Sequence, residues 1–282
     1  MKRKSIALVL GIAIMITMLA PLPVMAASGG TLVKSVKVYS YNSSDKKWRI
    51  DNKIDYSYTK AFPTEIKSTY YYGETVNTTK VKYKMTKKGL PKSAKHYSAI
   101  GRVDDKWKYN KKGLKTQTKY GNYFKKESRT NTYAYNKQGF VKKYSYVSKE
   151  KYSSGTETYK GEYTYKYVMA KGLPKTMTSK RISNGVASTY SYIVTYNKKG
   201  LITKVEYVNS EGAKSPEYKV SYKMKKGKVT SATVTSYYDN KYNNSSRYVF
   251  KYTKDKANKA RYANMINSVV MGTGSFGAYN WY

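Results

Sequence analysis

Apolar and polar residues alternate with period two over most of the chain. Valine, tyrosine, phenylalanine or methionine occupies every second position over 81–85, 163–167, 218–224 and 248–252, and the positions between them are mainly polar and rich in lysine. Strict alternation is typical of a β-strand with one buried face, whereas a helix would repeat its apolar residues every three to four positions. The pattern therefore predicts antiparallel strands whose second face carries lysine.

A short turn sequence recurs between these strands. Near-identical copies of Tyr-Asn-Lys-Lys-Gly-Leu occupy 109–114, 135–140 and 196–201, and looser copies occupy 83–90, 165–173 and 222–229. Asparagine can cap a type I turn through its side chain, and glycine supplies the left-handed position of a G1 bulge. Each copy therefore predicts a β-hairpin. The longer polar connections, such as 148–161 and 239–247, are expected to form loops along one edge of the sheet.

The spacing of the turns indicates an internal repeat. The glycines of the six copies, at 89, 113, 139, 172, 200 and 227, are separated by 24, 26, 33, 28 and 27 residues. With degenerate outer copies, this gives about eight units over 28–254. The predicted fold is all-β, with repeated antiparallel hairpins forming an elongated or rolled meander. Alternation alone does not decide between an open sheet, a barrel and a sandwich.

The two ends of the chain depart from this pattern. Residues 1–27 begin with three cations, continue with an apolar run over 6–20 and end in small residues, which is the pattern of a cleavable secretory signal. The apolar run is shorter than the ~20 residues that a bilayer-spanning helix needs, and no second run follows, so no transmembrane segment is expected after cleavage. The sequence thus predicts a secreted protein that can be retained at the cell surface.

Residues 255–282 are predicted to form a C-terminal cap. Alanine, isoleucine and valine recur at helical spacing over 255–270, which favours a short helix. The tail over 272–282 is rich in glycine and ends in aromatic residues. We expect this tail to fold back over an end of the sheet, and a surface-recognition tail is the alternative.

Composition removes several classes of function. The chain has no cysteine, which excludes disulfide scaffolds and thiolate metal sites, and a single histidine, His96, which excludes sites built from several histidines. Its 35 tyrosines argue against a disordered polycation. Acidic residues such as Asp104, Asp105, Glu162 and Glu206 show no recurring spacing, so they are expected to form salt bridges rather than a catalytic pair. The sequence predicts no cofactor, no metal and no enzyme activity.

The charge balance points to an anionic partner. Lysine and arginine number 55 against 16 acidic residues, a formal net charge of +39, and 48 of the 55 cations are lysine. Lysine is a hydrated point charge, whereas arginine dominates specific bidentate phosphate recognition. An exported protein also meets envelope or matrix polyanions before it meets nucleic acid. Diffuse, salt-sensitive polyanion binding is therefore one interpretation, and lysines that merely solvate the sheet and protect its edges are the other.

The string Tyr-x-Tyr-Asn-x-x-Gly-Leu resembles the tyrosine/aspartate (YD, or Rhs-type) repeats of secreted and surface-associated bacterial proteins. The resemblance covers residues 80–230, with asparagine where that pattern has aspartate and without the arginine that follows its glycine. It implies a bacterial extracellular protein of the binding or surface-association kind. It also implies a continuous antiparallel meander that curls into a spiral or shell.

Two binding hypotheses follow from these observations. In the first, the lysine-bearing face binds an extracellular polyanion, and the candidate residues are Lys82, Lys84, Lys219 and Lys223. In the second, aromatic platforms stack on the sugar rings of a polysaccharide. The candidates for that role are Trp48, Trp107, Tyr70, Tyr71, Tyr72, Tyr237 and Tyr238. A third interpretation assigns most tyrosines to the core. One apolar face opposite a lysine face is also the reverse of a transmembrane barrel, whose outer face is apolar.

Overall fold

The structure is a computed structural model, and it describes residues 30–58, 63–87, 90–98, 101–111, 114–122, 126–137, 140–170, 173–183, 185–238, 241–257, 266–267 and 269–271. Sixteen strands lie within these residues. In chain order they are β1 (Gly30–Asn42), β2 (Lys47–Tyr58), β3 (Pro63–Tyr72), β4 (Thr75–Met85), β5 (Pro91–Ser98), β6 (Gly101–Tyr109), β7 (Lys115–Asn122), β8 (Glu127–Tyr135), β9 (Val141–Tyr152), β10 (Gly155–Ala170), β11 (Leu173–Ser183), β12 (Val186–Tyr196), β13 (Ile202–Val208), β14 (Lys214–Lys225), β15 (Lys228–Tyr238) and β16 (Lys241–Ala257).

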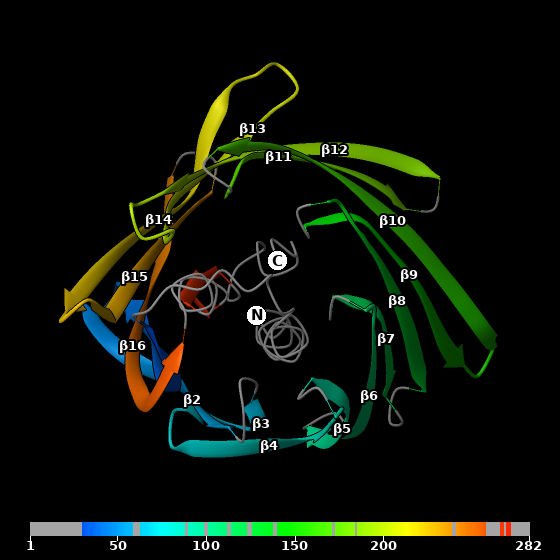
Figure 1. The fold of residues 1–282 in the computed structure, drawn as a ribbon, viewed down its shortest axis with the longest axis horizontal. Helices are drawn as coiled ribbons and strands as arrows, with labels where there is room; N and C mark the ends of the chain where they lie inside the picture. The colour runs from blue at the N-terminus through cyan, green and yellow to red at the C-terminus, as the bar shows by residue number, and fades with distance from the viewer. Residues whose placement is uncertain are drawn as a thin grey trace.

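The strands form one closed antiparallel barrel (Figure 1). Each strand pairs with its neighbours in sequence, and β16 pairs with β1 from Gly30↔Ala257 to Ser40↔Ser246 to complete the ring. The predicted all-β meander of antiparallel hairpins is confirmed. The elongated form of that prediction is wrong, because the first and last strands pair with each other. Closure gives both terminal strands a partner and leaves the sheet without an exposed edge.

The alternation of the sequence separates the two faces of the barrel wall. On β14, Tyr218 and Val220 are buried among the hydrophobic core, while Lys219 and Lys223 are exposed. A large core cluster is contributed by β1, by β8–β16 and by residues 266–271, and a smaller one by β2–β6. The inner face is therefore apolar and rich in tyrosine, and the outer face carries the lysines.

The predicted turns occur where their asparagines are present. The side-chain Oδ1 atoms of Asn110, Asn136 and Asn197 accept hydrogen bonds from the N–H groups of Leu114, Phe140 and Leu201 at 3.0, 2.9 and 3.1 Å. In the reverse direction, the backbone N–H of each asparagine donates to the carbonyl oxygen of the same partner. The hairpin registers contain a bulge next to each of these turns. Side chain and backbone of one residue thus both close the turn.

Two of the turn glycines confirm the left-handed conformation that the sequence predicts. Gly200 has a φ of 75° and Gly227 a φ of 78°, a region that residues with a Cβ atom rarely adopt. The corresponding glycines at 89, 113, 139 and 172 lie outside the described residues.

A row of tyrosine hydroxyl groups ties successive hairpins together. Near the end of five even-numbered strands, a tyrosine donates a hydrogen bond to a backbone carbonyl oxygen near the start of the preceding strand. The donor and acceptor residues are Tyr58 and Val33, Tyr135 and Lys115, Tyr167 and Val141, Tyr222 and Ile202, and Tyr252 and Val229, at 2.6–2.7 Å. Each of these tyrosines therefore supplies a partly buried ring and also satisfies a backbone acceptor beside a bulge.

The C-terminal segment packs inside the ring of strands (Figure 1). Helical residues are described at 266–267 and 269–271, within the helix predicted over 255–270. Its predicted start is wrong, because β16 extends to Ala257, and residues 258–265 lie outside the described residues. Buried Asn267 donates from Nδ2 to the Gly200 carbonyl at 2.9 Å and accepts at Oδ1 from the Ile202 N–H at 2.9 Å. One side chain thus joins this segment to the 196–201 turn. None of the helices among the described residues has the length and apolar character to cross a membrane.

The loops expected over 148–161 and 239–247 are wrong for the described residues, which exclude 239–240. Tyr152 and Gly155 pair at the end of a tight hairpin between β9 and β10, and the ladder continues along both strands. Tyr242–Asn244 likewise pair with β15. Their polar side chains belong to the exposed ends of long strands. The predicted signal over 1–27 and the aromatic tail over 272–282 lie outside the described residues.

Replacement of Gly200 by alanine tests the turn. Gly200→Ala should lower the free energy of unfolding by about 1–2 kcal/mol, because a Cβ atom disfavours the left-handed region. Gly121→Ala is the matched control, since Gly121 has no heavy atom within 4 Å of a built Cβ and no left-handed φ. That control should stay within about 0.5 kcal/mol of the parent. Urea denaturation measures both, and equal values for the two variants would contradict the assigned turn.

Candidate polyanion-binding surface

The four lysines that the sequence singled out lie exposed on the outer face, in two separate places. Lys82 and Lys84 belong to β4, and Lys219 and Lys223 belong to β14. Five strands separate β4 from β14 along the shorter way around the barrel, and Figure 1 shows the two strands on different sides. The four lysines therefore do not form a single site.

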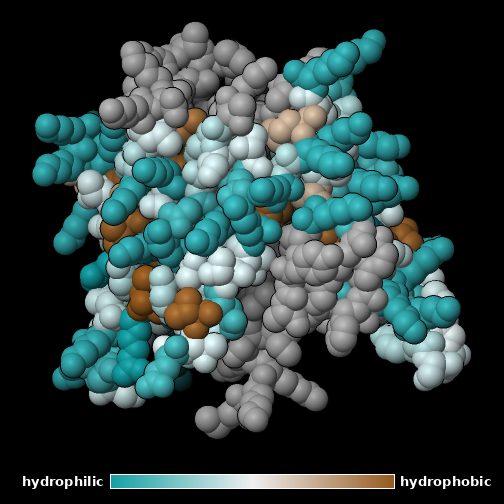
Figure 2. All heavy atoms as spheres, turned by 90° about the horizontal axis from the view of Figure 1, so that it is seen from below, coloured by the Kyte–Doolittle hydropathy of each residue, from teal (hydrophilic) through white to brown (hydrophobic). Residues whose placement is uncertain are grey.

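The register of β4–β7 gathers further lysines around Lys82 and Lys84. Lys82 lies directly opposite Lys95, Lys84 opposite Ser93, Ser93 opposite Lys106, and Lys106 opposite Lys119. We call six exposed outer-face lysines of these strands the lysine strip; its members are Lys82, Lys84, Lys95, Lys106, Lys108 and Lys119. Lys80 of β4 is also exposed on this face but pairs with Glu65, so it is not counted in the strip. Figure 2 shows the barrel from the side of β2–β5, where hydrophilic side chains predominate.

Cross-strand lysine pairs bring like charges together. Directly opposed residues on neighbouring strands have Cβ atoms about 4.5–5.5 Å apart, and like charges so placed destabilise the sheet. Three other pairs, Lys37↔Lys53, Lys67↔Lys80 and Lys204↔Lys219, each have an acidic partner at hand. The ion pairs are Lys53–Asp55 at 2.8 Å, Lys80–Glu65 at 3.1 Å and Lys204–Glu206 at 2.6 Å. Among the described residues, no ion pair involves a lysine of the strip.

The strip rests on a packed wall. The opposite faces of the same strands bury Val81, Tyr83, Ala94 and Trp107 in the smaller core cluster, together with residues of β2 and β3. The rings of Tyr83 and Trp107 are 5.8 Å apart. Because Trp107 is only 6% exposed, its assignment as a sugar-stacking platform is wrong. Its bulk instead supports the lysine-bearing wall from inside.

The three consecutive tyrosines of β3 divide between the two faces. Tyr70 is 9% exposed on the inner face, where burial raises the pKa of its hydroxyl, so it does not offer a free platform and that prediction is wrong. Tyr71 points to the outer face, opposite Val76 of β4. Tyr72 stacks on Tyr70 with ring centroids 6.3 Å apart and remains 44% exposed. Only Tyr72 of the three presents much of its surface to solvent.

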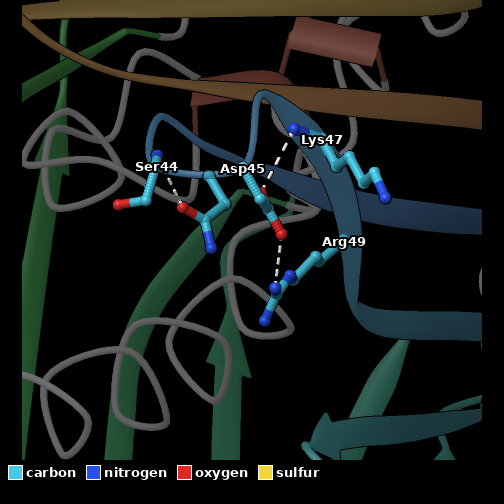
Figure 3. Close-up of polar contacts among 5 residues, drawn as sticks. Ser44, Asp45, Lys47 and Arg49 are labelled. Carbon is cyan, nitrogen blue, oxygen red and sulfur yellow. Dashed lines mark hydrogen bonds and ion pairs between the residues drawn. The ribbon is translucent and has the colours of Figure 1, made fainter.

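Trp48 lies beside the β1–β2 turn, with one side of its ring already in contact with a cation. The guanidinium of Arg247 on β16 lies 4.2 Å from the ring centroid, and the ring of Tyr41 lies at 5.3 Å. Figure 3 shows the turn next to it, where Asp45 accepts from the Lys47 N–H and pairs with Arg49. Arg247 therefore already occupies a ring face of Trp48 on which a sugar would have to stack.

The tyrosines at the end of β15 are more exposed. Tyr237 has the ammonium of Lys219 5.2 Å above its ring, and Tyr238 is 79% exposed. Tyr237 pairs with Tyr242 of β16, which is 52% exposed. This hairpin end is the most exposed group of aromatic rings among the predicted stacking candidates and their neighbours.

Several described acidic residues pair with lysines or lie on the inner face. Glu162 pairs with Lys143 at 2.7 Å and Glu206 with Lys204, as the sequence predicts. Asp105 and Lys115 lie on the inner face, where burial raises the pKa of Asp105 to about 7 and lowers that of Lys115. The opposite charge of each partner counteracts both shifts. No group of three or more acidic or histidine side chains within the described ranges could hold a metal ion.

Comparison with known proteins identifies a fold and no family. No family model matches the chain, and no curated protein matches it. Among solved structures, a porin-like protein from Bacteroides uniformis is similar over 80% of this chain and 100% of its own, with 13% identity and a TM-score of 0.52. A TcdB2-TccC3-TEV structure matches over 72% of this chain and 18% of its own, with 9% identity. Its TM-score of 0.17 is too low to indicate a shared fold. The first likeness supports the closed barrel.

Lys95, Lys106, Lys108 and Lys119 were not singled out from the sequence. Period-two alternation can assign a lysine to the outer face, but it does not tell which lysines of neighbouring strands lie opposite each other. The register supplies that information, because the bulge between Lys108 and Tyr109 fixes how β6 faces β7.

Reversing one charge tests the repulsion within the strip. Lys106→Glu should raise the free energy of unfolding by about 0.2–1 kcal/mol at low salt, because the introduced carboxylate would face Lys119. Lys166→Glu, which alters an exposed outer lysine opposite Thr178, is the control and should gain less. At 1 M salt, where the Debye length is about 3 Å, the difference should vanish. Equal gains for the two variants would show that no local repulsion exists.

The buried Asp105 should leave a signature in the pH dependence of stability. Its pKa is about 7 in the folded protein and 3.8 in the reference state, so between these values the folded state binds more protons than the unfolded state. Stability contributed by Asp105 should therefore fall as the pH rises from about 4 to about 7. In urea denaturation across this pH range, the free energy of unfolding of Asp105→Asn should fall less steeply with pH than that of the parent. An identical slope in both proteins would contradict the burial of this carboxyl group.

Proposed function

We propose that the protein is secreted and associates with polyanions outside the cell or at its surface, such as wall phosphate polymers or acidic polysaccharides. The observation that carries the proposal is the lysine strip, in which six exposed lysines on four adjacent strands have no ion-pair partner among the described residues. An anionic polymer would supply the missing counter-charges.

The chemistry of the surface favours diffuse attraction. Neighbouring strands lie ~4.8 Å apart, well within the ~8 Å Debye length at physiological ionic strength, so the charges of the strip act together. Lysine ammonium groups are flexible point charges that do not impose a bidentate geometry. Such a surface can bind a repeating polyanion in many alternative alignments, and salt lowers its affinity. We therefore expect binding that does not depend on the detailed structure of the polymer, and no enzyme activity.

The polarity of the wall supports an aqueous setting for the barrel. Strands that face lipid carry apolar residues outward, whereas here valine and tyrosine face inward and lysine faces outward. The predicted secretory signal and the resemblance of the turns to YD repeats fit a bacterial surface protein. Retention at the producer's surface would then arise from electrostatic attraction to its envelope polymers.

A carbohydrate-binding role is the alternative function. Exposed Tyr238 and Tyr242 at the end of the β15–β16 hairpin, and Tyr72 on β3, have the free ring surface that stacking on a sugar requires. These rings are dispersed, and each lies near lysine-bearing strands. These tyrosines are therefore better suited to assist the binding of a polysaccharide by the lysines than to form a separate sugar site.

Titration with three polymers separates the two functions. The secreted form is titrated with a wall phosphate polymer, a sulfated polysaccharide and a neutral glucan at two salt concentrations. Polyanion binding should weaken steeply with salt, as expected for counterion release. The polyanion should also raise the melting temperature by mass action. Salt-independent binding of the neutral glucan, with no response to either polyanion, would overturn the proposal in favour of the carbohydrate-binding function.

A further inference from the structure

We propose that the lysine strip on β4–β7 is the principal contact for the polyanion, and that it holds a flexible linear phosphate polymer lying across the strands. This inference rests on the proposed function and narrows it to one face and one class of polymer. The strip is distinct from the β14 lysines, because Lys219 faces Lys204 and Tyr237 and lies beyond five intervening strands.

The register arranges the lysines of the strip in rows that run across the strands. One cross-strand row contains Lys84, Ser93, Lys106 and Lys119, and the next contains Lys82, Lys95 and Asp104. The first row places three cations over three strand intervals, roughly 14 Å, without an acidic residue. Carboxylates flank the second row at both ends, because Glu65 of β3 lies opposite Lys82 and Asp104 lies opposite Lys95. A negatively charged chain is therefore expected to follow the first row and to avoid the ends of the second.

The residues between and beside the lysines of the strip have short or no side chains. Ser93 lies between Lys84 and Lys106, and Thr130 of β8 lies opposite Lys119. Gly121, on the outer face of β7 opposite Asp104, has open space where a Cβ atom would lie. A polymer backbone can therefore approach the sheet closely enough for several ammonium groups to reach successive phosphates.

The side-chain chemistry suits a flexible anionic chain such as a phosphate polymer. Lysine binds phosphate as a point charge that imposes no fixed geometry, whereas arginine uses a rigid fork. A flexible polymer can adjust its phosphates to cations that are about 4.8 Å apart across strands and about 7 Å apart along them. The packed core cluster beneath β4–β6 keeps the attachment points fixed while the ammonium groups remain mobile.

Two matched quadruple variants test the inference. The strip variant carries Lys84→Gln, Lys95→Gln, Lys106→Gln and Lys119→Gln. The control carries Lys149→Gln, Lys160→Gln, Lys166→Gln and Lys180→Gln, which are exposed lysines of β9–β11 that lie opposite uncharged residues. Both lose the same net charge. Binding of a purified wall phosphate polymer is measured by calorimetry at several salt concentrations, with inorganic phosphate as a monomeric comparison.

The strip variant should bind the polymer at least ~10-fold more weakly than the parent and with a smaller salt slope, while the control should lose less than about threefold. Asp104→Asn should bind more tightly, since it removes the negative charge at one end of the second row. Melting curves at low salt should show that the strip variant is at least as stable as the parent, because neutralisation removes repulsion. A loss of binding would then not reflect unfolding.

The possible failures are distinguishable. If the parent binds no polyanion, the proposed function itself is overturned. If both quadruple variants lose affinity equally, attraction is spread over the whole surface and the strip is not the principal contact. If the strip variant loses binding to a sulfated polysaccharide while the parent ignores the phosphate polymer, the strip is a contact for a different anion and the assignment to phosphate is wrong.

Discussion

The closed ring of paired strands is the constraint on which the remaining structure depends. The chain has no cysteine, and each hairpin buries only one face, so no unit can be stable alone. Pairing of β1 with β16 removes the two edges that an open meander would expose. The five tyrosine hydroxyl groups that bind carbonyl oxygens near the strand starts reinforce the ladder beside the bulges.

Tyrosine suits the inner wall of such a wide ring. A barrel of this strand number is too broad for small wall residues to meet across its centre, so side chains must cover one another along the wall. Tyr163, Tyr165 and Tyr167 do so, with successive ring centroids 6.4 Å apart. Phe250 and Tyr252 repeat the arrangement at 6.5 Å. The hydroxyl groups of Tyr167 and Tyr252 then reach backbone carbonyl oxygens that a phenylalanine would leave unsatisfied.

Local features of this fold could be predicted from the sequence, whereas features that join distant residues could not. The hairpins, the asparagine-capped turns and the left-handed Gly200 all follow from signals within a few residues. Closure depends on the pairing of residues near 30 with residues near 257, which leaves no local pattern. Tyr70 was misassigned because three consecutive tyrosines cannot all face inward and their order alone does not tell which of them does. The structure buries Tyr70 and Trp107 on the inner face. Only Lys82 and Lys84, two of the six lysines of the strip, were predicted, because the pairing of neighbouring strands leaves no local pattern.

The candidate binding surface is a consequence of the turn chemistry. Asn110 closes the β6–β7 turn from both its side chain and its backbone, and the adjacent bulge absorbs one residue of β7. A shift of register by one residue would turn every side chain of β7 to the other face, which would bury Lys119 and expose Thr118. The lysines of the strip can therefore lie side by side only while the turn holds its register. Their mutual repulsion is tolerated because the apolar wall and the closed ladder stabilise the sheet, and a polyanion that relieves this repulsion would bind the folded barrel more tightly than the unfolded chain's scattered charges.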